Sequence, residues 1–509
     1  MAAASTLSPA EVRLIKAMLL LRPRPSYQAI LSYFTRPKRD INHRVIAEIA
    51  AGQSWPSEPP AEEGEARAYM AAAERAPRVS AEHYVPVGRR TRPRQPQWVS
   101  TLILDWWPVG QGLFSSGMLM RRRAPPLTWV YDCGTSSSDE LLREALTCFA
   151  AERAALSGGS IRLAVLSHFD KDHISGFVRL LDSTRVRTVL LPYIPIWQRL
   201  VIALEQGVAA DDPLLEFFLD PAAFLTRADD HGIEEILFVP PSGPDDLPDE
   251  PGPAAEGEEG PFEGSEGGDL LKIDYGDPPA EAATDVITAA AAGAAVRFLR
   301  PAGRLLAPRF WEFVPYNDAE MAPKATPAFL HAATPLLHSL LNDASERSNA
   351  LQALKKLYAR TFGKSSMAKN VISLFLYSGP LGGRTFLWPW ALYAGSAGAS
   401  AIDRCSQMHT GDGLLDSPAR YDRFERFFVS GGRLARCAFL QVMHHGARGS
   451  WHEGLASKLS PIVSVFSSDP AHKGYGHPHA EVLRDFWPYG AVQVDSSHRL
   501  CFYGLQESR

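Results

Sequence analysis

The spacing of apolar residues predicts three short helices at the start of the chain. Ser8-Pro9-Ala10-Glu11 has the form of a capping box with proline at the first helical position, so a helix is expected to begin there. Ser26 can cap a second helix, in which apolar residues recur at helical spacing from Tyr27 onward. Asp40 is a candidate cap for a third helix over residues 41–51, which Gly52 would end.

Three such helices within residues 1–60 follow the plan of a helix-turn-helix module. In that plan the third helix and the basic turn before it would meet nucleic acid. The residues expected to make these contacts are Arg36, Lys38, Arg39, Asn42, His43 and Arg44. The alternative is a three-helix interaction module with a solvated basic face. Residues 61–98 are expected to be a linker, basic at its end, which could also follow a phosphate backbone.

A buried strand is predicted at residues 163–166, and the polar segment after it offers four potential metal ligands. Alternate side chains of an extended chain point the same way, so His168, Asp170 and Asp172 should converge. A helix starting near His173 would turn that imidazole toward the same point, and Gly176 would let the helix approach the strand. Turn and capping roles are the alternative, but so many charged and imidazole groups close together favour one or two bound cations.

This segment resembles the His-x-Asp-x-Asp-His variant of the metallo-β-lactamase superfamily motif, as in the hydrolase domain of the ComEC-type DNA-uptake family. The other segments that resemble the family, in the same order, are Val109-Gly110-Gln111-Gly112, Tyr131-Asp132-Cys133-Gly134, Lys369-Asn370-Val371-Ile372-Ser373-Leu374, Thr410-Gly411-Asp412, Val442-Met443-His444-His445-Gly446 and Tyr475-Gly476-His477-Pro478-His479. The resemblance covers roughly residues 99–195 and 365–505. It implies an α/β protein with an αβ/βα four-layer sandwich over residues 99–509.

The resemblance also implies a site for two divalent metal ions. Its ligands would be His168, Asp170, Asp172, His173, Asp412 and one of His444 or His445. Asp412 would bridge the ions, unless Thr410-Gly411-Asp412 is an ordinary turn. The catalytic residues would be Asp172, Asp412 and His445.

Four further residues have two readings each. Asp132 is either a turn residue or, as the resemblance implies, an acceptor that orients a ligand histidine. His477 and His479 either cap a helix that begins near Ala480 or contact phosphate and the metal ligands. Lys171 could contact a substrate phosphate, but its place between two aspartates favours an outward-facing charge.

Composition agrees with a large soluble enzyme. The chain has 509 residues, of which 45% are hydrophobic, so two to three domains are expected. An odd number of cysteines, five, argues against a disulfide framework, and no apolar run reaches membrane-spanning length. We therefore expect a cytoplasmic protein with no membrane partner. The net charge of −5 argues against a uniformly basic surface.

An insertion is expected at residues 196–367, where helix-like stretches interrupt the hydrolase. Residues 240–269 are rich in Pro, Gly, Glu and Asp, and are expected to be disordered. The insertion could form a lid or substrate platform, or could pack on the far side.

The ligand set predicts a hydrolase in which two metal ions share a water, lower its pKa and direct the hydroxide at an electrophile. The oxygen ligand Asp170 favours Mn²⁺ or Mg²⁺ relative to an all-histidine site, and Zn²⁺ also fits. The function expected first is a nuclease or phosphodiesterase acting on DNA or RNA, in bacterial defence or DNA processing. Two alternatives are a small-molecule ester or lactone hydrolase, and a DNA-binding regulator whose hydrolase-like domain is not catalytic.

Overall fold

The structure of the protein is a computed structural model. It describes residues 7–34, 43–74, 98–121, 124–157, 159–227, 232–250, 271–285, 290–291, 293–307, 310–321, 325–343, 345–363, 372–381, 386–388, 400–402 and 404–507.

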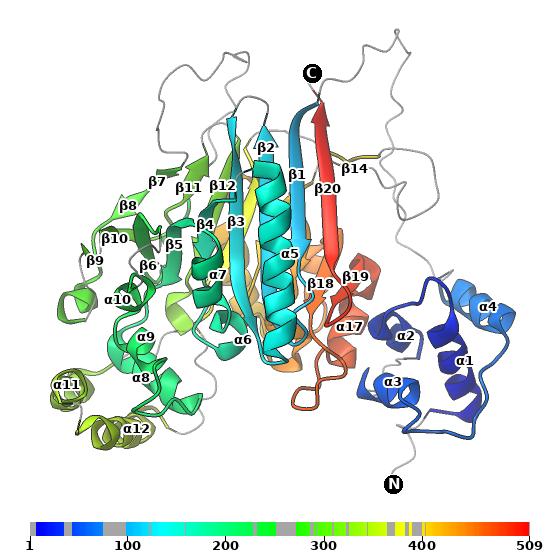
Figure 1. Cartoon of the computed structure of the whole chain (residues 1–509), viewed down its shortest axis with the longest axis horizontal. Coiled ribbons are helices and arrows are strands. Elements are labelled where there is room, and N and C mark those ends of the chain that lie inside the picture. Colours follow the sequence, from blue (N-terminus) through cyan, green and yellow to red (C-terminus); the bar gives the residue numbers. More distant parts are fainter. Residues whose placement is uncertain are drawn as a thin grey trace.

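Two mixed β-sheets form the centre of the molecule (Figure 1). The first sheet has the order β15-β14-β20-β1-β2-β3-β4-β5-β6-β10-β8, with β9 beside β10. Its strands are β1 (Trp98–Trp106), β2 (Gly112–Arg121), β3 (Ala124–Thr135), β4 (Ile161–Val165), β5 (Val186–Pro192), β6 (Glu235–Val239), β8 (Tyr275–Gly276), β9 (Ala290–Ala291), β10 (Ala294–Leu299), β14 (Phe386–Trp388), β15 (Ser400–Ile402) and β20 (Leu500–Glu507). Strands β3 to β6 run parallel to one another.

The second sheet has the order β19-β18-β17-β16-β13-β12-β11-β7. Its strands are β7 (Lys272–Ile273), β11 (Leu305–Ala307), β12 (Trp311–Tyr316), β13 (Phe375–Pro380), β16 (Ser406–His409), β17 (Cys437–Gln441), β18 (Val463–Ser467) and β19 (Ala491–Val494). Strands β16 to β19 are parallel. Each sheet therefore has a parallel part whose strands end at a common edge.

The two sheets pack face to face through large aromatic side chains. The ring centroids of Trp129 on β3 and Trp311 on β12 lie 5.3 Å apart, and those of Trp106 and Phe439 lie 5.7 Å apart. Successive residues of a strand point to opposite faces, so Trp129 belongs to this inner core while its neighbour Val130 packs with the helices outside.

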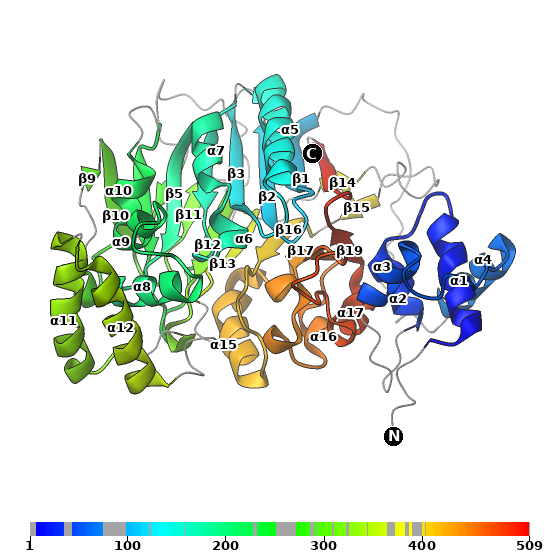
Figure 2. The same cartoon turned by 60° about the horizontal axis from the view of Figure 1, so that its bottom comes forward.

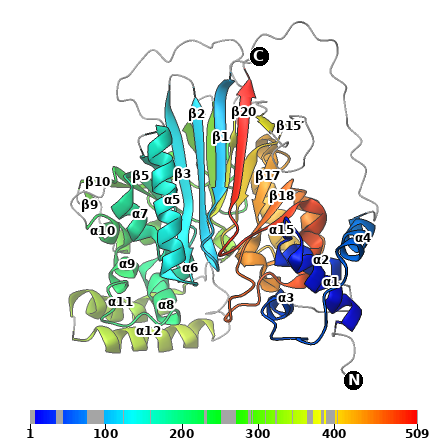
Figure 3. The ribbon, with the colours of Figure 1, turned by 45° about the vertical axis from the view of Figure 1, so that its right-hand side comes forward.

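Helices cover the outer face of each sheet. On the first sheet these include α5 (Asp139–Ser157), α6 (Lys171–Ile174) and α7 (Phe177–Ser183); on the second they include α15 (Pro418–Val429), α16 (Leu455–Leu459) and α17 (Ala480–Phe486). Figure 3 shows α5 and α15 on opposite sides of the paired sheets. The predicted α/β class is confirmed, as a sandwich of two sheets between helices.

The N-terminal helices pack against the second-sheet side of this sandwich. They are α1 (Pro9–Leu20), α2 (Tyr27–Phe34), α3 (His43–Ala50) and α4 (Glu63–Glu74), and the capping box at Ser8 and Glu11 is present. Tyr33 of α2 meets Trp487, just beyond α17, edge to face at 6.0 Å. Figure 2 shows α2 beside α17. α4 falls in the segment expected to be a linker, and it packs on α1.

The segment expected to be a helical insertion also contributes strands to both sheets. Its helices include α8 (Ile196–Glu205), α9 (Leu215–Leu219), α10 (Pro221–Leu225), α11 (Pro327–Asn342) and α12 (Arg347–Phe362), with shorter 3₁₀ turns η1 (Ala280–Thr284) and η2 (Ala319–Met321). However, β6 continues the parallel part of the first sheet, and β12 pairs with β13 in the second. The predicted helices are present, but the strands were not predicted, because short apolar runs do not distinguish a buried strand from a helix.

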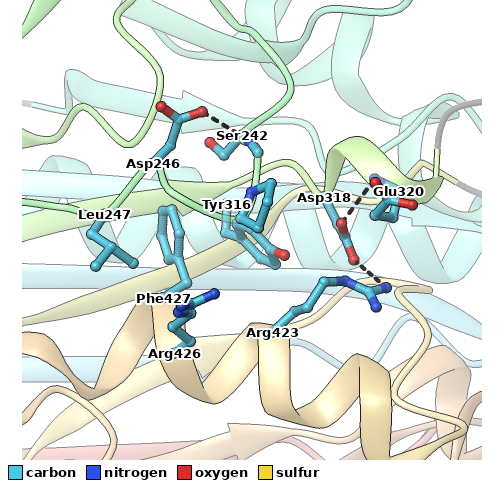
Figure 4. Close-up of a pocket in the computed structure, with 11 residues that line it drawn as sticks. Ser242, Asp246, Leu247, Tyr316, Asp318, Glu320, Arg423, Arg426 and Phe427 are labelled. Carbon is cyan, nitrogen blue, oxygen red and sulfur yellow. Dashed lines mark hydrogen bonds and ion pairs between the residues drawn. The ribbon is translucent and has the colours of Figure 1, made fainter.

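The expected disorder at residues 240–269 is wrong for its first part. Ser242 forms a β-bridge with Asp318, and the amide of Gly243 donates to Asp246. Asp318 in turn pairs with Arg423 of α15 at 3.2 Å (Figure 4). These polar contacts hold a segment whose composition has few apolar side chains, and residues 251–270 lie outside the described part.

Two expectations from composition agree with the structure. The five cysteines are free. Among the helices of the described residues, none has the length and apolar character needed to cross a membrane.

Candidate metal centre

The predicted ligands meet where parallel strands of both sheets end. Asp132 lies near the end of β3, and residues 167–173 follow β4 in the first sheet. Asp412 follows β16 and the pair His444–His445 follows β17 in the second sheet. The carboxyl edge of parallel strands is where α/β proteins commonly bind ligands, because side chains from several loops converge there.

Close packing of backbone holds the first half of this site. A Cβ atom at Gly134 would lie 2.5 Å from the carbonyl carbon of His173, so only glycine lets α6 approach β3. At Gly176 a Cβ would lie 2.9 Å from the carbonyl oxygen of Cys133, and the Gly176 amide donates to that oxygen. The helix near His173 and the role of Gly176 agree with the sequence-based prediction.

Asp132 fixes the start of the loop after β4. Its Oδ1 accepts from the backbone amide of Ser167 at 2.7 Å, and its Oδ2 accepts from the Ser167 hydroxyl at 2.7 Å. Oδ2 also accepts from Nδ1 of His173 at 2.7 Å. Asp132 thus contacts and orients His173, a candidate ligand, and is not only a turn residue.

The histidines of the cluster use Nδ1 for outward contacts. The Ser167 hydroxyl lies 2.8 Å from Nδ1 of His168, and because that hydroxyl donates to Asp132, it accepts from the imidazole. Nδ1 of His445 donates to the Ser467 carbonyl at 2.5 Å, and Nδ1 of His444 lies 3.2 Å from the Ser450 hydroxyl. These contacts leave Nε2 of each ring facing the centre, as in metal-bound histidines.

The Nε2 atoms converge on the carboxylate of Asp412, and each carboxylate oxygen lies nearest to a different pair of these nitrogen atoms. Oδ1 lies 3.2 Å from Nε2 of His173 and 3.6 Å from that of His445. Oδ2 lies 3.2 Å from Nε2 of His444 and 3.7 Å from that of His168. Both late histidines therefore reach Asp412, one on each oxygen.

Asp170 and Asp172 complete the two halves. An oxygen of Asp170 lies 3.7 Å from Nε2 of His168, on the Oδ2 side of Asp412. An oxygen of Asp172 lies 3.3 Å from Nε2 of His445, on the Oδ1 side. Each half thus has two imidazoles, one carboxylate of its own and one oxygen of Asp412.

The donor atoms fit a metal ion. Nε2 of His168, His173 and His445 and Oδ1 of Asp412 are buried without a hydrogen-bond partner among the described residues. Burying polar atoms unpaired is unfavourable, and bound cations would satisfy them. Two groups of ligand atoms are close enough together to bind an ion: His168, His173 and Asp412, and Asp172, His173 and His445. His173 belongs to both groups, so the first group includes imidazoles from both halves.

The pKa values of the clustered side chains reflect their burial and their close neighbours. Burial, together with the charges of Asp172 and Asp412, raises the pKa of Asp170 to about 7. Burial would also raise the pKa of Asp172, but the neighbouring imidazoles of His445 and His173 together outweigh it and lower that pKa to about 2. Burial and the neighbouring His173 lower the pKa of His168 to about 4, which keeps its imidazole neutral and able to bind a cation.

Backbone strain accompanies the site. His444 and His445 both adopt positive φ, at 47° and 56°, and Asp132 does so at 53°. Left-handed conformations are uncommon for residues with a Cβ and cluster at functional sites. The strained pair at the end of β17 sends one imidazole to each oxygen of Asp412.

Several residues of the site were not predicted from the sequence. The Ser373 hydroxyl accepts from the Asp412 amide at 3.0 Å, and Oε1 of Gln441 accepts from the amides of Thr410 and Gly411 at 2.8 and 2.7 Å. The side-chain amide of Gln206, just after α8, donates to Asp170 at 2.7 Å. The insertion therefore reaches the metal centre, and only Ser373 carried a signal, since it lies in a motif of the resemblance.

His477 and His479 differ in their positions. The His477 ring is mostly buried, with its centroid 5.3 Å from that of His444. His479 precedes α17 but makes no side-chain cap, and its Nδ1 accepts from the Arg448 amide at 3.2 Å. His479 is therefore the N-cap residue of α17, although its side chain does not cap the helix. Lys171 begins α6, but its side chain lies outside the described part.

Most of the predicted nucleic-acid contacts lie outside the described residues. These are Arg36, Lys38, Arg39, Asn42 and the side chain of His43. Arg44 is exposed on α3 and pairs with Glu48 at 3.1 Å. Of residues 369–374, a segment of the resemblance, the first three also lie outside the described part.

Comparison with known proteins identifies no relative of this chain. No protein-family model matches the chain, and a search of curated proteins finds no significant match.

Proposed function

We propose that the protein is a metal-dependent hydrolase that holds two divalent cations at the Asp412 cluster and cleaves phosphodiesters in nucleic acid. The observation that carries this proposal is the division of the Asp412 carboxylate. Each oxygen faces two imidazole nitrogens, with Asp170 on one side and Asp172 on the other. A carboxylate placed between two similar ligand sets suits a bridging role.

The kind of ligand favours phosphate chemistry. Three carboxylates and four imidazoles form a mixed oxygen and nitrogen set, which accepts Mn²⁺ or Zn²⁺ and, through its oxygens, Mg²⁺. A pair of such ions activates water and stabilises both the entering and the leaving oxygen of an in-line displacement. The same set would also serve other esters, but the resemblance to the ComEC-type hydrolase domain favours a nuclease.

The protein's own residues orient this chemistry. Asp132 and the Ser467 carbonyl fix the rings of His173 and His445, so their Nε2 atoms keep a lone pair toward the centre. Gln206 donates a hydrogen bond to Asp170. Because the pKa of Asp170 is raised, this carboxyl takes up a proton more readily than an ordinary aspartate. His477, beside His444, would contact a bound phosphate.

The resemblance further supports a metallo-β-lactamase-like topology for the sandwich. In that reading the N-terminal helices recruit nucleic acid through the basic residues around α3. Recruitment of nucleic acid by these helices is supported by the sequence alone. It predicts that the protein binds DNA with a salt-dependent affinity and that removing residues 1–60 abolishes this binding.

The test is cleavage of single- and double-stranded DNA and RNA by the full chain, stripped of metal and then supplied with Mn²⁺, Mg²⁺ or Zn²⁺. Asp172→Ala is the site variant, and Asp182→Ala, an exposed aspartate on nearby α7, is the matched control. Metal-dependent cleavage lost only in Asp172→Ala supports the proposal. A protein that binds metal stoichiometrically and cleaves none of the four polymers contradicts it.

A further inference from the structure

Helix α8 of the insertion ends beside the metal centre in a defined backbone conformation. Gly207 adopts a left-handed conformation with φ of 75°, and its amide donates to the Leu204 carbonyl at 3.2 Å. The next amide, of Val208, donates to the Ala203 carbonyl at 2.9 Å. This Schellman arrangement satisfies the last carbonyls of a helix and suits glycine at the left-handed position. It fixes the backbone of Gln206, the residue before the glycine.

The side chain of Gln206 uses both of its N–H groups on the loop that carries the first ligands. Its amide nitrogen donates to the Phe169 carbonyl at 2.7 Å and to Oδ1 of Asp170 at 2.7 Å. Both partners are acceptors, so the NH₂ group, and not the amide oxygen, is the end that faces the loop. The two hydrogen bonds fix the orientation of this half-buried side chain.

Packing of α8 and α9 holds the same loop from the apolar side. The buried ring of Phe169 lies edge to face with Phe217 and Phe218 of α9, with centroids 4.9 and 6.2 Å away. The buried side chain of Arg199 on α8 donates to the Phe218 carbonyl at 2.8 Å, which ties the two helices together. Asp170 therefore follows a residue whose ring and carbonyl are both held by the insertion.

The two oxygens of Asp170 have different environments. Oδ1 accepts from Gln206, whereas Oδ2 lies 3.7 Å from Nε2 of His168, among the predicted ligands. A free carboxylate can turn both oxygens to one ion, but a carboxylate with one oxygen in a hydrogen bond presents mainly the other. Asp172, in the other half of the centre, pairs instead with His445 from the second sheet. Gln206 thus acts on one half of the centre.

We propose that Gln206 is a positioning residue: it reserves Oδ2 of Asp170 for an ion and makes that half of the centre prefer Mn²⁺ to Ca²⁺. Ca²⁺ takes about six to eight oxygen ligands and often binds a carboxylate through both oxygens, whereas Mn²⁺ takes about six ligands. A carboxylate limited to one oxygen suits the smaller coordination shell. The inference deepens the proposed function and rests on its metal centre, but metal affinity is measured without turnover.

The experiment is titration of the metal-stripped full chain with Mn²⁺, in which electron paramagnetic resonance measures the free ion, followed by displacement of Mn²⁺ with Ca²⁺. The variant is Gln206→Leu, which removes both N–H donors and keeps a similar size. Gln352→Leu, an exposed glutamine on α12 of the same insertion, is the matched control. Gln206→Leu is also combined with Asp170→Asn, and thermal unfolding without metal shows whether each variant is folded.

We expect Gln206→Leu to weaken one of two Mn²⁺ ions about tenfold, within the range for loss of a contact behind a ligand, and to leave the other ion unchanged. Ca²⁺ should displace Mn²⁺ from this variant at an about tenfold lower concentration than from the wild type, because the released Oδ1 offers Ca²⁺ a second oxygen. In the Asp170→Asn protein, Gln206→Leu should have no further effect, since Gln206 acts through Asp170. Gln352→Leu should match the wild type.

The inference is overturned if Gln206→Leu binds both ions as the wild type does, or if it weakens the Asp170→Asn protein as much as the wild type. It is also overturned if Ca²⁺ displaces Mn²⁺ from the variant only at the wild-type concentration or above, because a merely structural role would lower both affinities together. A chain that binds the ions but cleaves no polymer refutes the nuclease alone. A chain that binds no ion refutes both.

Discussion

Nδ1 of His173 donates to Oδ2 of Asp132 over 2.7 Å, and both side chains are fully shielded from solvent. This contact fixes the tautomer of the imidazole, because a proton held on Nδ1 leaves a lone pair on Nε2. The same carboxylate also holds the amide and hydroxyl of Ser167. Asp132 therefore organises the loop that carries the first ligands without reaching the centre itself.

Replacing Asp132 with Asn should weaken metal binding while the fold persists. The amide removes the charge and one acceptor facing His173, and loss of such an outer contact typically costs about 10–100-fold in metal affinity. Competition with a chromophoric chelator measures the affinity. The control is Asp105→Asn, also a buried aspartate, which pairs with Arg153 at 2.8 Å away from the ligands. Asp105→Asn should lower the stability and leave the affinity unchanged; equal affinities in all three proteins would refute the role of Asp132.

Replacing Asp412 with Asn should remove metal from both halves of the site. Both oxygens of this carboxylate face imidazole nitrogens, and an amide keeps the size but offers one neutral oxygen in place of two charged ones. We expect the metal content, measured by mass spectrometry, to fall from about two ions per chain to less than one. Asp170→Asn, which touches one half only, should retain about one ion. A loss of two ions in both variants, or of one in both, would contradict a bridging carboxylate.

Replacing Gly134 with Ala should destabilise the protein and disturb the site together. The new Cβ would lie 2.5 Å from a backbone carbon of His173 and 2.6 Å from one of Asp172, and backbone cannot move aside as a flexible side chain does. Overpacking of this kind costs about 1–3 kcal/mol. Gly64→Ala on α4 is the control, because its Cβ meets open space, and it should be neutral or stabilising. Urea unfolding measures both, and equal stabilities would contradict the tight approach of α6 to β3.

The sequence could predict the part of the site that depends on short-range geometry. His168, Asp170, Asp172 and His173 lie within six residues, so a strand, a turn and a helix suffice to bring them together. Asp412, His444 and His445 come from a different sheet, and only the resemblance linked them to the first group. Their opposite placement on the two oxygens of Asp412 required the structure.

The contacts that no pattern predicted are between segments distant in sequence. Gln206 reaches Asp170 because α8 packs beneath the first sheet, and Gln441 holds the turn before Asp412 because β16 and β17 are neighbours. A lone glutamine carries no local signal for either role. The strands β6 and β10 were missed for another reason: their pairing partners, rather than their own short apolar runs, decide that they are strands.

The last prediction concerns the buried histidine His409, at the end of β16. Its side chain is fully buried between the sheets, its Nε2 lies 3.0 Å from the Ser115 hydroxyl, and its ring stacks on Tyr131 at 4.5 Å. Burial lowers the pKa of His409 to about 3, whereas a histidine of the unfolded chain titrates near about 6.5. Between these values the unfolded state binds the extra proton, so stability falls as the pH drops below about 6.5. The loss should reach about 2 kcal/mol at about pH 5 relative to neutral pH. His409→Gln removes the titration, so its free energy of unfolding in urea should fall less than that of the wild type over the same range, while other histidines contribute equally to both. Parallel curves for the two proteins would show that His409 can be protonated in the folded state, against its burial between the sheets.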